Sequence, residues 1–196
     1  MKKRIAVLVS GGGTNLQALI DAQGKVLCSG EIVLVVSNAA GAYALERAKK
    51  AGIATATLLK KELGGQAAFE KALADLLNEQ KIDVIILAGF MTILTEWFTR
   101  QYPERILNVH PALIPSFCGE GFYGLRVHEA ALRYGVKVTG ATVHFVNEIP
   151  DGGKIIAQKA VDILPGDTPE ILQRRVMEQA EWILLPQAAE TVCAGL

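Results

Sequence analysis

The feature that most constrains the fold is the alternation of short apolar runs with longer amphipathic segments. Runs rich in Val, Ile and Leu predict strands at residues 4–10, 31–37, 84–88 and 106–110, and a weaker pattern predicts one at 54–58. Apolar side chains at helical spacing predict helices from about residue 14, over 43–51 and over 67–80. Such alternation is typical of a parallel, doubly wound sheet. The unbroken apolar run at 84–88 indicates a strand that is buried on both faces.

The last third of the chain departs from this pattern. Two strands are expected at residues 136–146 and 154–161, joined by a loop that contains Pro150. Thr168 is a suitable N-cap for a final helix to residue 191, with Pro169 at its first position. We therefore expect an α/β fold with one doubly wound sheet, mostly parallel and mixed at one edge. A single domain over residues 1–196 accounts for all of these elements.

Composition excludes several classes of protein. Lys+Arg and Asp+Glu both number 20 and 51% of residues are hydrophobic, so the chain is neither disordered nor equipped with the basic excess of a general nucleic-acid binder. Cys28, Cys118 and Cys193 are scattered without metal-ligand spacing, which favours reduced thiols in the cytoplasm. The most apolar stretch, at 84–94, is shorter than the roughly 20 residues of a membrane span. We expect a cytoplasmic protein with no membrane, nucleic-acid or metal partner.

A glycine-rich turn, Ser10-Gly11-Gly12-Gly13-Thr14-Asn15, follows the first strand and opens the first helix. Glycines allow a ligand to approach the backbone closely, and free N–H groups at a helix start suit phosphate. The turn has no Gly-Lys-Ser/Thr, and Leu16 breaks the dinucleotide pattern Gly-x-Gly-x-x-Gly. A phosphate site and a plain strand-to-helix turn without a ligand both remain open from these residues.

The segment Ala88-Gly89-Phe90-Met91-Thr92-Ile93-Leu94 follows the most apolar strand. Because Gly89 interrupts the buried run, exposed backbone beside large apolar side chains is able to hold a flat heterocycle by main-chain hydrogen bonds. The competing interpretation is ordinary core packing, which is the more common role of such side chains.

Asn108 and His110 are two residues apart on a strand and therefore face the same side. An amide beside an imidazole is suited to stabilising an oxyanion and moving a proton. Asp151, in the loop after residue 146, would raise the pKa of His110 if it lay beside it. The competing interpretations are a pair that caps the Pro-rich turn and an ordinary turn aspartate.

The remaining histidines and tryptophans receive structural interpretations. His128 is expected on the surface of a helix, and His144 as a core residue or a support for the site. Trp97 and Trp182 lie in helical segments and are expected to pack. The histidines do not form a metal signature.

Taken in order, the glycine turn, Ala-Gly-Phe-Met-Thr-Ile-Leu, Asn-Val-His-Pro-Ala-Leu-Ile-Pro-Ser-Phe, Gly-Ala-Thr-Val-His-Phe-Val and Asp-Gly-Gly closely resemble phosphoribosylglycinamide formyltransferases. The resemblance covers about residues 3–190. It implies the formyltransferase fold and the transfer of a formyl group from 10-formyltetrahydrofolate, as co-substrate, to the amino group of glycinamide ribonucleotide in purine synthesis. Direct transfer implies neither a metal nor a covalent cofactor.

The resemblance also implies the roles of individual residues. The catalytic group falls on Asn108, His110 and Asp151, with a protonated His110. The nucleotide phosphate falls on Gly13, Thr14 and Asn15, and its ribose hydroxyls on Glu181. The folate falls on Met91, Thr92, Ile93, Leu94 and, again, Asn108.

Two positions depart from the family pattern. Thr92 stands where many relatives carry arginine, and Gln66 lies near a position where some relatives use arginine towards the folate tail. The stretch 117–127 is expected as a flexible loop near the site, longer than in the shortest relatives. Apolar helical faces would permit a homodimer.

Three other functions remain open. Formyl transfer to methionyl-tRNA and hydrolysis of formyltetrahydrofolate share the Asn-x-His…Asp pattern, but the related enzymes carry an additional domain. A non-catalytic nucleotide sensor would use the glycine turn and leave Asn108, His110 and Asp151 unexplained.

Overall fold

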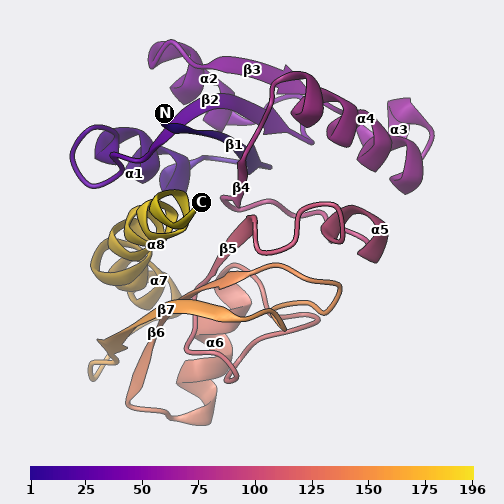
Figure 1. Ribbon diagram of the computed structural model, residues 1–196. Helices are drawn as coiled ribbons and strands as arrows, with labels where there is room; N and C mark the ends of the chain where they lie inside the picture. Colours follow the sequence, from indigo (N-terminus) through magenta and orange to yellow (C-terminus); the bar gives the residue numbers. More distant parts are fainter.

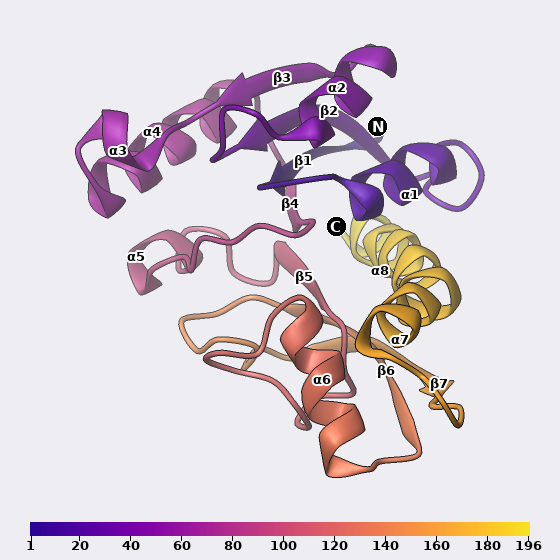
Figure 2. The same ribbon diagram turned by 180° about the vertical axis from the view of Figure 1, so that it is seen from behind.

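The computed structural model describes residues 1–196 and contains one twisted seven-stranded sheet with helices on both faces (Figure 1 and Figure 2). The strands are β1 (Lys3–Val9), β2 (Gly30–Ser37), β3 (Ala54–Thr57), β4 (Val84–Leu87), β5 (Ile106–His110), β6 (Val138–Phe145) and β7 (Ile155–Asp162). Their order across the sheet is β3-β2-β1-β4-β5-β6-β7.

Eight α-helices and one π-helical segment surround the sheet. They are α1 (Thr14–Ala22), α2 (Tyr43–Lys50), α3 (Lys60–Leu63), α4 (Gln66–Glu79), α5 (Glu96–Thr99), α6 (Leu125–Tyr134), α7 (Pro169–Val176), η1 (Met177–Glu181) and α8 (Trp182–Gly195). None of the helices is both long and apolar enough to span a membrane.

The five strands β1 to β5 are parallel, whereas β6 pairs antiparallel with β5 and β7 antiparallel with β6. The chain winds outward from β1 to β3 and then returns to place β4 on the other side of β1. Open sheets bind ligands beyond the carboxyl ends of the strands where the winding reverses. The topology therefore predicts a ligand site at the carboxyl ends of β1 and β4.

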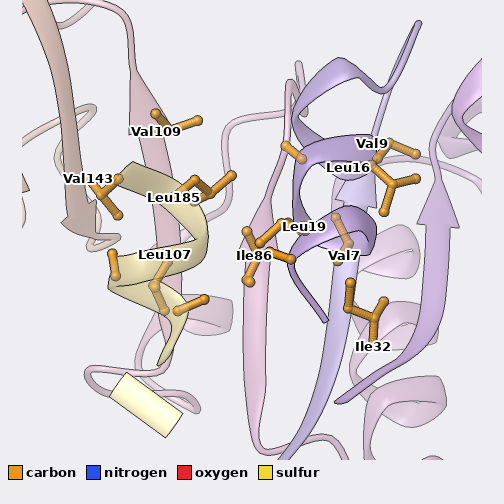
Figure 3. Close-up of a cluster of buried hydrophobic side chains, with 14 of the residues drawn as sticks. Val7, Val9, Leu16, Leu19, Ile32, Ile86, Leu107, Val109, Val143 and Leu185 are labelled. Carbon is orange, nitrogen blue, oxygen red and sulfur yellow. The ribbon is translucent and has the colours of Figure 1, made fainter. Parts of the chain in front are cut away.

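One face of the sheet packs against α1, α2, α7 and α8. Alternate side chains of each strand point to this face, as a two-residue repeat requires. Figure 3 shows Leu16 of α1 beside Val9, Leu19 beside Ile86, and Leu185 of α8 beside Leu107. The intervening residues of the same strands face the other way, which explains why residues 5–9 of β1 and all of β4 are apolar without interruption.

The opposite face packs against α4 and α5. Phe69, Leu73 and Leu77 recur at helical spacing along α4 and contact Ala6 and Leu8 of β1 through one buried cluster. Burying both faces of β1 and β4 makes the centre of the sheet a rigid frame for the loops at its carboxyl edge.

These elements confirm the predicted α/β class, the doubly wound parallel sheet and the antiparallel edge. The strand predicted at 106–110 has those bounds, and Thr168 caps α7 by accepting from Ile171 N at 3.3 Å. The predicted final helix is interrupted, because residues 177–181 form a π-helical turn between α7 and α8. The short helix α3 was not predicted, whereas α5 contains Trp97, which was expected in a helical segment.

Candidate active site

The N–H groups of the glycine turn are free and point out of the β1–α1 junction. The backbone N–H groups of Gly11, Gly12 and Gly13 donate no hydrogen bond within the protein. No side chain caps α1, whose first N–H groups have no partner inside the helix. Gly13 adopts a left-handed φ of 73°, and a Cβ there would lie 2.6 Å from the Cβ of Ala44. Only glycine fits this position, and the turn presents a row of unpaired donors suited to an anion.

Glu181 lies beside this turn although it is 166 residues away in sequence. Its Oε2 accepts a hydrogen bond from Asn15 Nδ2 at 2.8 Å. Burial raises the pKa of Glu181, and the bond from Asn15 only partly offsets this. The acid ends the π-helical turn, a distortion that often marks functional sites. The structure thus joins two of the sequence-predicted nucleotide-site residues.

The segment after β4 is not core packing for most of its length. Met91 and Ile93 are 59% and 67% exposed, whereas Leu94 is buried. Ser10 accepts a hydrogen bond from Met91 N at 2.8 Å, which connects this segment to the glycine turn. The N–H groups of Thr92, Ile93 and Leu94 donate no hydrogen bond within the protein. Free donors beside exposed apolar side chains suit a flat heterocycle.

Gln66 and Glu70 brace the same segment from α4. Gln66 Nε2 donates to Glu70 Oε1 at 2.7 Å and to Ile93 O at 3.1 Å. The buried Glu70 also accepts from Thr95 N at 2.7 Å. Gln66 is therefore engaged with the protein itself. The sequence predictions did not include Glu70. The one signal that could have identified it is its position on an otherwise apolar face of the helix.

Asn108 faces His144 on the neighbouring strand. The two residues are register partners of β5 and β6, and Asn108 Nδ2 lies 3.3 Å from His144 Nε2. His144 Nδ1 donates to Phe145 O at 2.8 Å, which fixes the orientation of the ring. His144 is thus a buried support for Asn108. An amide has two N–H bonds, so one remains for a ligand.

His110 and Asp151 come together beneath the loop that follows β5. His110 Nδ1 lies 3.4 Å from Asp151 Oδ2, and Asp151 Oδ1 lies 3.5 Å from His144 Nε2. His110 Nε2 donates to Phe117 O at 2.8 Å, and Gly119 N donates to Asp151 Oδ2 at 2.9 Å. The loop thereby contacts both members of the pair through its backbone, which no side-chain pattern could have revealed.

The electrostatics of the pair differ from the expectation of a protonated histidine. Burial lowers the pKa of His110, and this outweighs the opposing effects of Asp151 and the Phe117 carbonyl, so the pKa lies below its usual value. Burial raises the pKa of Asp151, but His144, His110 and the Gly119 N–H together hold it below its usual range. The predicted rise in the pKa of His110 was therefore wrong for the ligand-free protein: Asp151 does raise this pKa, but burial lowers it more.

Two further predictions were wrong. His128 lies on α6 but is only 1% exposed, and neither ring nitrogen has a hydrogen-bond partner. It packs on the inner face of the helix with Val127, Ala130 and Ala131. Trp97 is 53% exposed on α5, whereas packing was expected.

His128 makes the stability of the protein depend on pH. Burial, with a smaller contribution from His110, lowers its pKa to about 4. In the unfolded chain the pKa of this histidine is near 6.5. As the pH falls below that pKa, the unfolded chain binds a proton at this site and the folded protein does not. We expect this site to remove about 2 kcal/mol of the unfolding free energy between pH ~7.5 and pH ~5.

The measurement is urea unfolding of the wild type and of His128→Leu at both pH values. The variant is expected to lose less stability on acidification, because leucine does not titrate. Equal losses in the two proteins would contradict the assignment. Any remaining loss is expected from His110, whose pKa is lowered in the same direction.

Comparison with known proteins identifies the family to which the chain belongs. The model of the family described as formyl transferase matches residues 3–188. The chain belongs to the formyl transferase family. No group of three or more His, Cys, Asp or Glu side chains is arranged to hold a metal ion.

Several members of the formyl transferase family are similar over nearly the whole chain. The trifunctional purine biosynthetic protein adenosine-3 of Gallus gallus is 46% identical over 99% of this chain, which spans only 19% of that protein. A phosphoribosylglycinamide formyltransferase of Haemophilus influenzae is 44% identical over 90% of this chain and 81% of its own length. The crystal structure of glycinamide ribonucleotide transformylase 1 from Symbiobacterium toebii matches with a TM-score of 0.92 and 41% identity, covering 99% of this chain and 89% of that one.

Proposed function

We propose that residues 1–196 form one catalytic domain that transfers the formyl group of 10-formyltetrahydrofolate to the amino group of glycinamide ribonucleotide. The observation that carries this proposal is a contact set at the carboxyl edge of the sheet, in which the buried His110 and His144 meet the half-buried Asn108 and Asp151. A nucleotide sensor has no use for such a set. The names of the relatives in the formyl transferase family support the acceptor.

The acceptor is placed by the glycine turn. Its phosphate accepts from the free N–H groups of Gly13, Thr14 and Asn15, where the positive end of the α1 dipole adds to the attraction. Glu181, held by Asn15, accepts from the ribose hydroxyls. The neutral overall charge is consistent with a small phosphorylated acceptor and with no nucleic-acid partner.

The donor is placed by the backbone after β4. The free N–H groups of Thr92, Ile93 and Leu94 bind the polar edge of the pteridine, and the exposed Met91 side chain covers it. Thr92 accepts from Asn38 Nδ2 at 2.7 Å, so its side chain supports the segment. Gln66 cannot serve as a cation for the folate tail, because it is neutral and already bound to Glu70 and Ile93 O.

The transfer step requires an oxyanion site and a proton path. The acceptor nitrogen bonds to the formyl carbon, and the formyl oxygen becomes negative. Asn108 stabilises that oxygen with the N–H that His144 does not engage. When His110 is released from Phe117 O, its proton lies on Nδ1 towards Asp151, and its free Nε2 takes the proton that the amine loses.

The proton then completes the reaction. The nitrogen of the folate leaving group receives it as the bond from that nitrogen to the formyl carbon breaks, so no proton is gained or lost overall. Asp151 stabilises the imidazolium that forms in between, at 3.4 Å from its Nδ1. A neutral starting His110 is the form that this step needs. It involves no metal, and the three free thiols suit a cytoplasmic setting without a membrane.

The test is a spectrophotometric assay of folate product with 10-formyltetrahydrofolate and glycinamide ribonucleotide. We expect product only when this acceptor is added. Product with methionyl-tRNA, or with water alone, in place of the ribonucleotide would overturn the proposed acceptor and identify one of the two related reactions. The same preparation analysed by gel filtration reports whether the protein is a homodimer.

A further inference from the structure

We propose that Arg47 is a positioning residue for the phosphate turn, acting through the peptide bond between Gly12 and Gly13. This inference rests on the phosphate role proposed above and adds a side chain from α2. Arg47 directs the N–H of Gly13 towards the acceptor phosphate and supplies a positive charge behind it.

Two hydrogen bonds fasten the turn to α2. Ala44 N donates to Gly11 O at 3.0 Å, and Arg47 Nε donates to Gly12 O at 2.8 Å. In a planar trans peptide, the carbonyl and the following N–H point in opposite directions. The N–H groups of Gly12 and Gly13 must therefore point away from α2. Holding the two carbonyls fixes the direction of the two free donors.

The turn has no room to relax towards α2. A Cβ on Gly13 would meet the Cβ of Ala44 at 2.6 Å and the Cδ of Arg47 at 3.5 Å. The aliphatic part of Arg47 thus forms part of the wall behind Gly13. The turn is therefore already in the conformation that binds phosphate before the ligand is present.

The guanidinium itself is held and is not neutralised. Its Nη1 donates to Gln17 Oε1 at 3.1 Å, and the group lies 5.0 Å from the ring centroid of Tyr43. No carboxylate lies within 4.0 Å of it, and the neighbouring Glu46 is paired with Lys49. A fixed cation without a counter-charge adds to the positive potential of the α1 N-terminus. That potential favours a phosphorylated ligand over the same ligand without phosphate.

The test compares phosphorylated and unphosphorylated ligands in Arg47→Ala. We expect the KM for glycinamide ribonucleotide to rise about tenfold and ribose 5-phosphate, measured by calorimetry, to bind about tenfold more weakly. The kcat and the KM for 10-formyltetrahydrofolate are expected to stay within about twofold of wild type. With the dephosphorylated acceptor, kcat/KM is expected to be unchanged, which a merely structural role does not predict.

Two further variants sharpen the result. Lys50→Ala is the matched control, because Lys50 is an exposed cation on the same helix without a bond to the turn. It is expected to change ribose 5-phosphate binding by less than about twofold. Arg47→Lys retains the charge and loses the guanidinium fork, so an intermediate effect is expected. This variant also tests the inference if Arg47→Ala fails to fold.

Equal losses of kcat/KM with the phosphorylated and dephosphorylated acceptors would overturn the inference, as would unchanged ribose 5-phosphate binding in both Arg47 variants. The calorimetric measurement does not depend on formyl transfer. If the wild-type protein binds ribose 5-phosphate more tightly than the Arg47 variants but does not formylate the ribonucleotide, the proposed function is refuted and this inference stands.

Discussion

Replacement of His110 by alanine is expected to lower kcat for formyl transfer by about 10³-fold, within the range for loss of a general acid–base group. The physical reason is that His110 contacts Asp151 and is held by the loop through its hydrogen bond to Phe117 O. When the loop releases this bond, the imidazole becomes available to a ligand. The measurement is initial-rate kinetics with both substrates at saturation.

The loss must be chemical and not a loss of binding. The phosphate turn contains no atom of His110, so ribose 5-phosphate is expected to bind His110→Ala as it binds the wild type. Turnover that is unchanged in this variant would refute the mechanism. Turnover and phosphate binding that are lost together would show that the substitution disturbs the sheet edge and would also count against the assigned role.

Replacement of Asp151 by asparagine is expected to lower kcat by about 10²-fold, since the imidazolium formed during transfer loses its counter-charge. The amide is close in shape to the carboxylate and can still accept from Gly119 N. Without the negative charge, the pKa of His110 falls further below its usual value. The acidic limb of the kcat/KM profile is therefore expected to move to lower pH.

Asp162→Asn is a matched control, because Asp162 is an exposed carboxylate at the end of β7. This change is expected to leave both kcat and the pH profile as in the wild type. An Asp151→Asn enzyme with an unshifted acidic limb would show that the carboxylate charge does not act on His110.

The sequence was sufficient to predict the sheet and the helices that cover it, because the periodicity of apolar residues determines both kinds of element. The apolar run at 84–88 predicted a strand buried on both faces, and helical spacing within 67–80 predicted the helix whose Phe69, Leu73 and Leu77 cover one of those faces. The side chains of Asn108 and His110 were placed correctly because a two-residue repeat fixes which residues share a face of β5.

Other parts of the site could not be predicted because they depend on tertiary packing. The helical pattern around His128 does not state which face of α6 turns inward, and the structure turns His128 in. The contacts of Phe117 O and Gly119 N with the catalytic pair are made by backbone, so residue types carry no signal. The pKa of His110 was mispredicted because burial, which the sequence does not show, outweighs the nearby carboxylate.

The π-helical turn at Met177–Glu181 has a consequence for the lengths that this helix tolerates. A π turn accommodates an additional residue relative to α-helical winding. The turn absorbs one inserted residue; if the same residues wound as a regular α-helix, Glu181 would lie about 100° further around the axis, away from Asn15. The insertion therefore sets the angular phase of the acid relative to the glycine turn. In this stretch the number of residues per turn, more than their identity, determines whether Glu181 reaches Asn15.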